Sequence, residues 1–131
     1  MKSKEIARKF IIGIDEAGRG PLAGPVVVAG VLMSPRLAAH VLVGIKDSKQ
    51  LSAKQREAWF ETIIKGDELI PIISAASIIA KVTRDRIMLR LHKKYPHYRF
   101  DLHKGYGTKL HREMVRKFGK CEIHRKSFSF H

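Results

Sequence analysis

The sequence has few of the residues that would tie the chain together covalently or anchor it in a bilayer. Cys121 is the single cysteine among 131 residues, so no disulfide can form within the chain, which fits a reducing compartment. The apolar run near the start is interrupted by Asp15 and Glu16, and no apolar run is long enough to span a membrane. We therefore expect no signal peptide, no membrane partner and a cytoplasmic location.

Acidic residues are also scarce, and this scarcity gives the first indication of a partner. The chain carries 26 lysines and arginines against 12 acidic residues, a formal net charge of +14. From Lys81 to the end, 15 basic residues accompany 4 acidic ones, a net charge of +11, whereas the first 80 residues contribute +3. Such a field attracts a polyanion, and nucleic acid is favoured over a merely basic surface. An anionic membrane is disfavoured because the basic residues are not confined to one amphipathic helix.

Length and apolar content predict a single domain covering residues 1–131, of the α/β class. The hydrophobic fraction of 44% is typical of a globular protein with a core of its own. An apolar run at residues 10–14 and a valine-rich run at residues 25–32 predict two strands. We expect the glycine-rich segment between them to form the turn of an antiparallel hairpin.

Three helices are predicted after the hairpin. Their boundaries are marked by Ser52 with Gln55 in capping-box spacing, by Ser74, and by Thr108 with Gly119. Helical spacing assigns these apolar residues to buried faces: Trp59 and Ile63 in the first helix; Ala75, Ile78, Ile79, Val82 and Leu89 in the second; Leu110, Met114, Val115 and Phe118 in the third. The second helix should carry Lys81, Arg84 and Arg90 on its opposite face.

Three acidic residues are candidate metal ligands. Asp15 and Glu16 end the first predicted strand, and a bend in the segment that follows would let their carboxylates converge. Converging carboxylates suit a hard cation such as Mg²⁺ or Mn²⁺, although adjacent acids at a strand end are often merely solvated. Asp67 follows a glycine and precedes a helix, where it is either a turn residue or a third ligand. The histidines and Cys121 lack the spacing of a zinc site.

Two glycine-containing loops are candidate nucleic-acid contacts. The first is the turn formed by Gly18, Arg19 and Gly20, whose exposed amide groups could bind phosphate or hydroxyl oxygens, or which could be a plain hairpin turn. The second loop, HKGYGT at residues 103–108, places His103 and Lys104 beside Tyr106. Basic groups beside an aromatic ring suit a sugar–phosphate backbone, although a loop tyrosine next to a solvated lysine is the simpler alternative.

Taken in order, these segments resemble the motifs of the ribonuclease HII family. The resemblance extends from Ile12 to Phe128 and rests on six blocks: GIDEAGRGPLAGP at residues 13–25, DSKQL at 47–51, KGD at 65–67, SAASIIAKVTRD at 74–85, HKGYGT at 103–108 and HRKSF at 124–128. Each block is modest alone, but six in the family's order are not expected by chance.

The resemblance implies a ribonuclease H-like fold, a small central mixed sheet flanked by helices. It also implies a monomeric, metal-dependent endonuclease that hydrolyses the RNA strand of RNA–DNA hybrids, including single ribonucleotides in duplex DNA, with two Mg²⁺ or Mn²⁺ ions. Asp15, Glu16 and Asp67 match three of the family's four metal-holding carboxylates. By the same resemblance, the turn of Gly18, Arg19 and Gly20 would recognise the ribose 2′-OH together with Tyr106, while Lys49, His103 and Lys104 would hold phosphates.

The chain departs from the family in one place. The remaining family carboxylate belongs to a D-G motif between the first helix and the KGD block, and no D-G dipeptide occurs in this sequence. The fold is therefore expected to be shortened by an internal deletion between Ile63 and Ile64. Three alternatives stay open: an active ribonuclease, a catalytically impaired nucleic-acid-binding remnant of the family, and a chain that does not fold alone.

Overall fold

The computed structural model describes residues 10–34, 50–64 and 72–129 of the chain. The predicted phosphate contact Lys49 and the predicted metal ligand Asp67 lie outside the described residues. By its internal contacts the chain divides into two compact units, and the prediction of a single domain stays a prediction. Unit 1 comprises Met1–Asp15 and Ala29–Ile79, and unit 2 comprises Glu16–Val28 and Ala80–His131. Each unit is described by itself.

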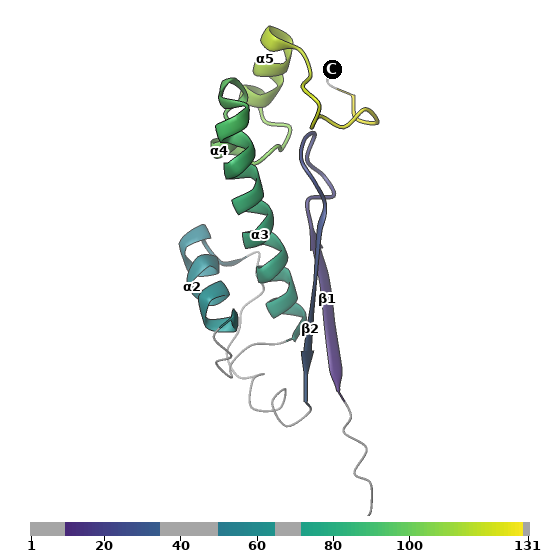
Figure 1. The fold of residues 1–131 in the computed structure, drawn as a ribbon, viewed down its shortest axis with the longest axis vertical. Coiled ribbons are helices and arrows are strands. Elements are labelled where there is room, and N and C mark those ends of the chain that lie inside the picture. Colours follow the sequence, from purple (N-terminus) through teal and green to yellow (C-terminus); the bar gives the residue numbers. More distant parts are fainter. Residues whose placement is uncertain (1–9, 35–49, 65–71, 130–131) are drawn as a thin grey trace, which may run out of the picture. The chain divides into compact units, whose positions relative to one another are not determined.

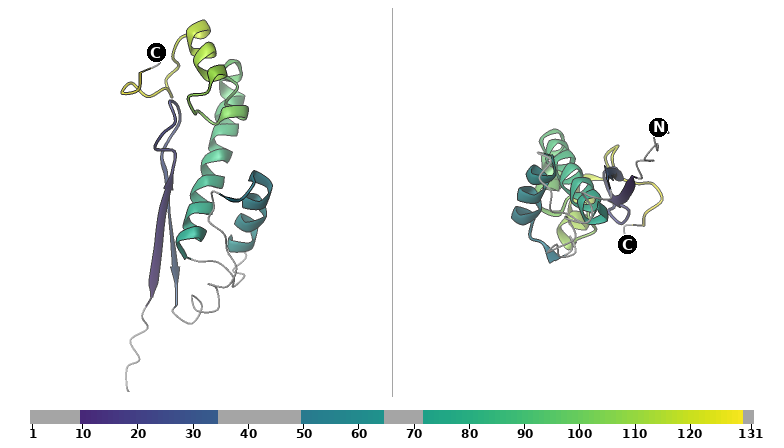
Figure 2. Two further views of the ribbon diagram at one scale, coloured as in Figure 1. Left: turned by 180° about the vertical axis from the view of Figure 1, so that it is seen from behind. Right: turned by 90° about the horizontal axis from the view of Figure 1, so that it is seen from below.

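The predicted hairpin is confirmed. Strands β1 (Ile11–Ala17) and β2 (Val27–Met33) pair in a two-stranded antiparallel sheet, and Figures 1 and 2 show them side by side. Strand β1 continues to Ala17, so the bend expected in this segment begins at Gly18. Pro25 has no amide hydrogen to donate to a ladder, which agrees with β2 beginning only at Val27.

In unit 1, the sheet has one covered face and one open face. Gly13 lies so close to the first turn of α3 (Ile72–Lys94) that an added Cβ would come within 2.4 Å of the Ile72 carbonyl oxygen. The alternate residues Ile12 and Ile14 point the other way and are 63% and 64% exposed. On β2, Leu32 is also exposed. Strand alternation thus separates a packed face from an apolar face in contact with solvent.

Helix α2 (Ala53–Ile64) follows the predicted capping box. The Ser52 amide donates to Gln55 Oε1 at 2.8 Å, and the Gln55 amide donates to Ser52 Oγ at 3.2 Å. These two bonds satisfy backbone donors that a helix start leaves open. Trp59 is half-buried rather than deep in a core.

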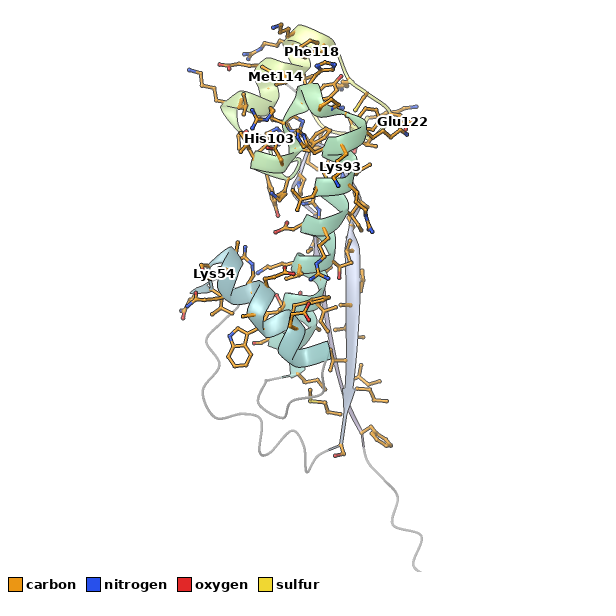
Figure 3. All side chains as sticks on the ribbon, turned by 60° about the vertical axis from the view of Figure 1, so that its left-hand side comes forward. Lys54, Lys93, His103, Met114, Phe118 and Glu122 are labelled. Carbon is orange, nitrogen blue, oxygen red and sulfur yellow. The ribbon has the colours of Figure 1, made fainter. Side chains whose placement is uncertain are left out.

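Unit 2 is built around an aromatic cluster. Its helical segments after α3 are the 3₁₀ turn η2 (Pro96–Tyr98), α4 (Phe100–His103) and α5 (Lys109–Phe118). The buried residues that share the cluster are Ala23, Met88, Tyr98, Phe100 and Val115. The Tyr98 and Phe100 rings stack with centroids 5.4 Å apart, a favourable offset separation. The labelled side chains of Figure 3 show His103 and Met114 in this part of the chain.

The predicted ends of α5 are confirmed, but some predicted faces are wrong. Thr108 Oγ1 accepts from the His111 amide at 3.2 Å, and Gly119 ends the helix with φ 76°. Leu89 and Phe118 were expected inside and are exposed, while Arg84 was expected outside and is buried. Successive helix residues are rotated by about 100°, so the burial of Met88 turns Leu89 outward. Among the described residues, no helix is apolar over a length that could cross a membrane.

Candidate nucleic-acid interface

Within unit 2, Arg84 of α3 donates hydrogen bonds to the segment between β1 and β2. Arg84 Nε donates to the Pro25 carbonyl at 3.0 Å, and Nη2 donates to the Ala23 carbonyl at 3.1 Å. Burial lowers the pKa of the Arg84 guanidinium, and the nearby Tyr106 and Asp85 offset this lowering in part. Gly18 has φ 97°, and a Cβ there would meet Arg84 Nε at 2.2 Å. Only glycine therefore fits at this position of the turn.

The loop that carries Tyr106 is fastened to the same turn. The Gly105 carbonyl accepts from the Leu22 amide at 2.8 Å and from the Ala23 amide at 3.3 Å. Arg84 Cζ lies 5.4 Å from the centroid of the Tyr106 ring, a cation–π distance. The ring itself is 48% exposed, so it remains accessible to a ligand. Gly18 and Tyr106, predicted from separate motifs, thus contact one buried guanidinium.

A second arginine holds the turn from the C-terminal segment. Arg125 Nη1 donates to the Arg19 carbonyl at 2.8 Å, and Nη2 donates to the carbonyls of Gly18 and Gly24. Arg125 Nε also donates to the Gly24 carbonyl at 3.2 Å. All three guanidinium nitrogens therefore bond to the backbone of the turn.

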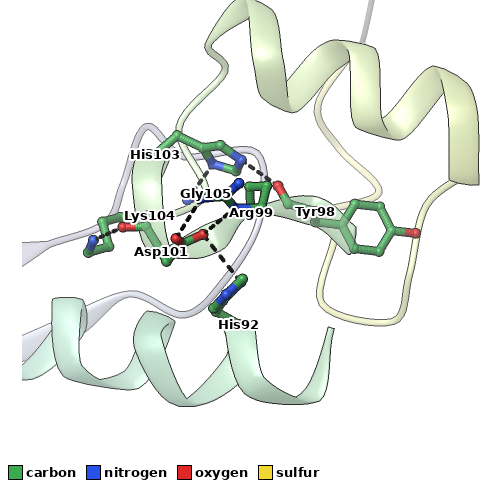
Figure 4. A network of polar contacts seen from close by, with 7 residues as sticks. All are labelled: His92, Tyr98, Arg99, Asp101, His103, Lys104 and Gly105. Atoms are coloured by element: carbon green, nitrogen blue, oxygen red, sulfur yellow. Dashed lines mark hydrogen bonds and ion pairs between the residues drawn. The ribbon is translucent and has the colours of Figure 1, made fainter. Parts of the chain in front are cut away.

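His103 lies inside the Tyr106 loop rather than on its surface. Its Nε2 is 2.7 Å from the Tyr98 carbonyl, and its Nδ1 accepts from the Gly105 amide at 3.2 Å, as Figure 4 shows. The side chain is buried, and both ring nitrogens have partners within the chain. In this structure His103 offers no donor to a phosphate, contrary to expectation, and instead fixes the shape of the loop.

Two further histidines support the loop from the other side. His111 Nδ1 is 2.8 Å from the Tyr106 carbonyl, and His111 Nε2 is 3.1 Å from His124 Nε2. His124 Nδ1 accepts from the Cys121 amide at 3.0 Å. This arrangement assigns a proton to His111 Nδ1 and to His124 Nε2, so both rings are neutral. Burial lowers the pKa of His111 to about 4 and lowers the pKa values of His103 and His124.

Lys104 follows this buried histidine and adopts a left-handed conformation with φ 48°. Its Nζ donates to the Asp101 carbonyl, a contact drawn in Figure 4. Arg99 binds the Asp101 carboxylate through two bonds of 3.0 Å and holds the pKa of that carboxyl below its usual range. Lys104 is half-buried, and its ammonium group has further N–H donors besides the one directed at the Asp101 carbonyl.

The predicted metal ligands are only partly described. Asp15 and Glu16 lie on β1, and Glu16 Oε1 is 3.6 Å from Arg19 Nη1. Across residues 10–34, 50–64 and 72–129, no three His, Cys, Asp or Glu side chains come together in a way that could hold a metal ion. Carboxylates are the donors that a hard divalent cation prefers, so the chemistry fits. Two carboxylates alone supply fewer donors than such a cation takes.

Sequence patterns missed the residues that hold the site together. Arg84, Arg125, His111 and His124 were not assigned a role, although each bonds to one of the two predicted loops or supports a residue that does. Arg84 had one signal, a charged residue four positions before Met88 in a largely apolar helix. His124 and Arg125 had one signal, their place in the HRKSF block, whereas His111 lies in none of the six blocks.

Comparisons of the sequence and of the structure with known proteins agree on one family. The family model described as Ribonuclease HII matches residues 12–65 and 60–130. Proteins named Ribonuclease HII from Burkholderia mallei (strain SAVP1) and Burkholderia thailandensis are 38% identical over 182 residues, covering 92% of this chain and 84% of each relative. The ribonuclease H2 of Pyrococcus horikoshii OT3 superposes with a TM-score of 0.68 at 24% identity, over 93% of this chain and 95% of that one.

A second solved structure, the PCNA:RNase HII complex from Archaeoglobus fulgidus, is similar with a TM-score of 0.71 at 25% identity, over 90% of this chain and 94% of that one. The alignment with the Burkholderia relatives is longer than this chain. Its 182 residues exceed the 131 residues of this chain, so parts of the relatives have no counterpart here. The chain is shorter than its relatives, and the two matched segments of the family model meet at residues 60–65.

Proposed function

Because the chain belongs to the ribonuclease HII family, whose members are endonucleases acting on RNA–DNA hybrids, we propose that it recognises a ribonucleotide within a duplex and hydrolyses the RNA strand there. The observation that carries this proposal is the shared contact of Gly18 and Tyr106 with Arg84. A glycine turn next to an exposed aromatic hydroxyl offers both amide groups and a phenol to a ribose. The 2′-OH is the group that distinguishes RNA from DNA at such a place.

Binding would use the surroundings of the turn. The amides of Gly18, Arg19 and Gly20 would face the ribose, and Lys49 and Lys104 would contact phosphates. His103 would contribute by holding the loop, since both its ring nitrogens are bonded within the chain. The partner is an RNA–DNA hybrid or a ribonucleotide-containing DNA duplex, and a monomeric state and a cytoplasmic location remain predictions.

Hydrolysis would depend on the acidic residues. The family requires a divalent cation, and we assign Asp15, Glu16 and Asp67 to hold Mg²⁺ or Mn²⁺ by their match to the family motif. Bound metal ions supply an activated water and stabilise the leaving oxygen of a phosphodiester. Neutralising either described carboxylate, as in Asp15→Asn or Glu16→Gln, should weaken Mn²⁺ binding in calorimetry while leaving nucleic-acid affinity intact or raised.

A second candidate is a binding remnant with impaired catalysis. It is favoured by the absence of any D-G dipeptide, because the family's remaining carboxylate belongs to that motif. Two cations held close together repel each other, and carboxylates offset that repulsion. We infer that the internal gap falls between Ile63 and Ile64, which agrees with the meeting point of the two matched segments. At least one metal site should then be weakened.

One experiment separates these candidates. A DNA duplex containing a single ribonucleotide is incubated with the chain in Mg²⁺, in Mn²⁺ and in chelator, and an all-deoxy duplex serves as the matched control. Metal-dependent cutting at the ribonucleotide supports the endonuclease. Tight binding without cutting supports the remnant. Absence of both, together with a non-cooperative melt, would mean that the chain does not fold alone and would defeat the proposal.

A further inference from the structure

We propose that Arg125 is a positioning residue that aims the amide groups of Arg19 and Gly20 at the ribose 2′-OH of the substrate. The inference rests on the proposed function of the Gly18–Gly20 turn as the ribonucleotide contact. It assigns to Arg125, a half-buried residue bonded to the backbone of the turn rather than in contact with substrate, control over the discrimination of RNA from DNA.

The planar peptide bond determines the direction in which each amide of the turn points. In a trans peptide the carbonyl and the following amide point in opposite directions, and the described residues contain no cis peptide bond. Arg125 Nη2 bonds to the Gly18 carbonyl, so the Arg19 amide must point away from the guanidinium. Arg125 Nη1 bonds to the Arg19 carbonyl at 2.8 Å, so the Gly20 amide must do the same. One side chain therefore orients two consecutive amides.

These amides have no competing use within the part of the chain that the structure describes. The neighbouring amides of Leu22, Ala23 and Gly24 donate to carbonyls of unit 2 at 2.8, 3.3 and 3.0 Å. By contrast, no backbone carbonyl of the described residues accepts from Arg19 or Gly20. The side chain of Arg19 is 81% exposed, so it leaves the turn open. Two parallel donors on an open turn suit a hydroxyl oxygen or an anionic oxygen.

The geometry requires arginine at this position rather than any cation. The guanidinium serves three carbonyls at once, those of Gly18, Arg19 and Gly24, through a rigid planar fork. Arg125 Cζ also lies 5.6 Å from the Phe128 ring centroid, which restricts the plane of the fork. A lysine would preserve the charge, but its flexible ammonium cannot direct all three carbonyls together.

The test compares Arg125→Lys with Arg116→Lys, a charge-matched control on the exposed surface of α5. Affinity is measured in chelator for a duplex containing one ribonucleotide and for the same duplex in all-deoxy form. We expect Arg125→Lys to lose about tenfold in the ratio of the two affinities, the size expected for misdirected hydrogen bonds. Affinity for the all-deoxy duplex should change little, while the melting temperature should fall because hydrogen bonds to backbone carbonyls are lost. Arg116→Lys should keep the wild-type ratio.

The outcomes separate the two proposals. If the wild-type chain discriminates and Arg125→Lys discriminates equally well, the role of Arg125 is refuted while the proposed function stands. If the wild-type chain shows no preference for the ribonucleotide, the proposed function fails and this inference falls with it. A loss of affinity for both duplexes in equal proportion would also refute a positioning role, because a general loss is what a merely structural arginine would cause.

A second measurement needs no variant and so does not depend on the folding of Arg125→Lys. Amide resonances of the wild-type chain are followed while each duplex is added. The ribonucleotide-containing duplex should shift the amides of Arg19 and Gly20 more than the all-deoxy duplex does, with the amides of Leu22 and Ala23 as internal controls. Equal shifts with both duplexes would overturn the inference.

Discussion

The two units of this chain differ in the hydrogen bonding of their polar groups and in the exposure of their apolar side chains. In unit 2 the turn carbonyls bond to Arg84 and Arg125, the histidines bond to the Tyr106 loop, and Phe100 is fully buried. In unit 1 the sheet carries an open apolar face, formed by Phe10, Ile12, Ile14 and Leu32, which are 54% to 64% exposed. Unit 2 also exposes apolar side chains, such as Val28 and Leu102, so the contrast lies in its buried polar network and in the exposed apolar strand face of unit 1.

The place where the chain is shorter than its relatives falls in the same unit as the exposed strand face. The relatives align over 182 residues against the 131 residues present here, and the family match divides at residues 60–65, which belong to unit 1. The residues assigned to ribonucleotide contact, apart from Lys49, all belong to unit 2. A loss confined to unit 1 should therefore leave recognition in place while removing a catalytic carboxylate and part of a hydrophobic layer.

The largest expected effect is a contrast in stability between the units. Phe100→Ala should lower the free energy of unfolding by about 3–5 kcal/mol, because it empties a fully buried aromatic site. Ile14→Ala should cost about 0.5 kcal/mol or less, because that side chain is mostly in water. Urea denaturation of both variants measures the contrast, and equal costs would show that the face of unit 1 is covered after all.

Restoring the missing segment should change unit 1 most. A family-like segment with the D-G aspartate is inserted between Ile63 and Ile64. We expect the cleavage rate to rise by about a hundredfold or more, since even residues that merely support metal ligands contribute roughly 10–100-fold. The melting temperature should also rise, because apolar surface becomes buried. A version with asparagine in place of the D-G aspartate is the control and should recover stability without the rate.

Lowering the pH should destabilise unit 2 more than unit 1. Because burial holds the pKa of His111 at about 4 against 6.5, the unfolded chain binds a proton in this interval that the folded chain does not. Its stabilising contribution is complete above about pH 6.5 and is lost as the pH falls towards 4. His111 alone should lower the free energy of unfolding by about 2 kcal/mol between about pH 7.5 and about pH 5.

The lowered pKa values of His103 and His124 add to this effect in the same direction. Hydrogen exchange at the two pH values, corrected for intrinsic rates, should show α5 opening more readily in acid while α2 changes less. His97→Gln removes an exposed histidine and should leave the pH profile unchanged. A stability that is flat from neutral pH to about pH 5 would contradict the neutral histidine arrangement.

The smallest expected effect concerns selectivity within unit 2. Tyr106→Ala removes an exposed ring from Arg84 without emptying a core position. The preference for a ribonucleotide-containing duplex should fall by about fivefold to tenfold, the size of one hydrogen bond with some loss of stacking. Tyr106→Phe keeps the ring and isolates the hydroxyl. Equal losses on hybrid and plain DNA duplexes would count against a role in selectivity.

Local sequence patterns were sufficient where the structure is locally determined. The hairpin, the capping box at Ser52 and the Thr108 cap follow from residues a few positions apart, and all three are confirmed. Arg84 was misplaced because helical periodicity assigns a charge to the surface, whereas here distant carbonyls of Ala23 and Pro25 satisfy it in the interior. His103 was predicted to hold a phosphate from its place in the HKGYGT loop, whereas both its ring nitrogens have partners within the chain. Long-range hydrogen bonds to backbone atoms have no signature in local spacing.

We expect this chain to keep the family's affinity for a ribonucleotide-containing duplex while its cleavage rate is reduced. The most direct test measures both on one substrate, a duplex with a single ribonucleotide, for this chain and for the Burkholderia thailandensis relative. Affinity is taken in chelator and the cleavage rate in Mn²⁺. We expect the two affinities to agree within about tenfold, while the rate of this chain is lower by about a hundredfold or more. Equal rates, or an affinity that falls in proportion to the rate, would contradict the account.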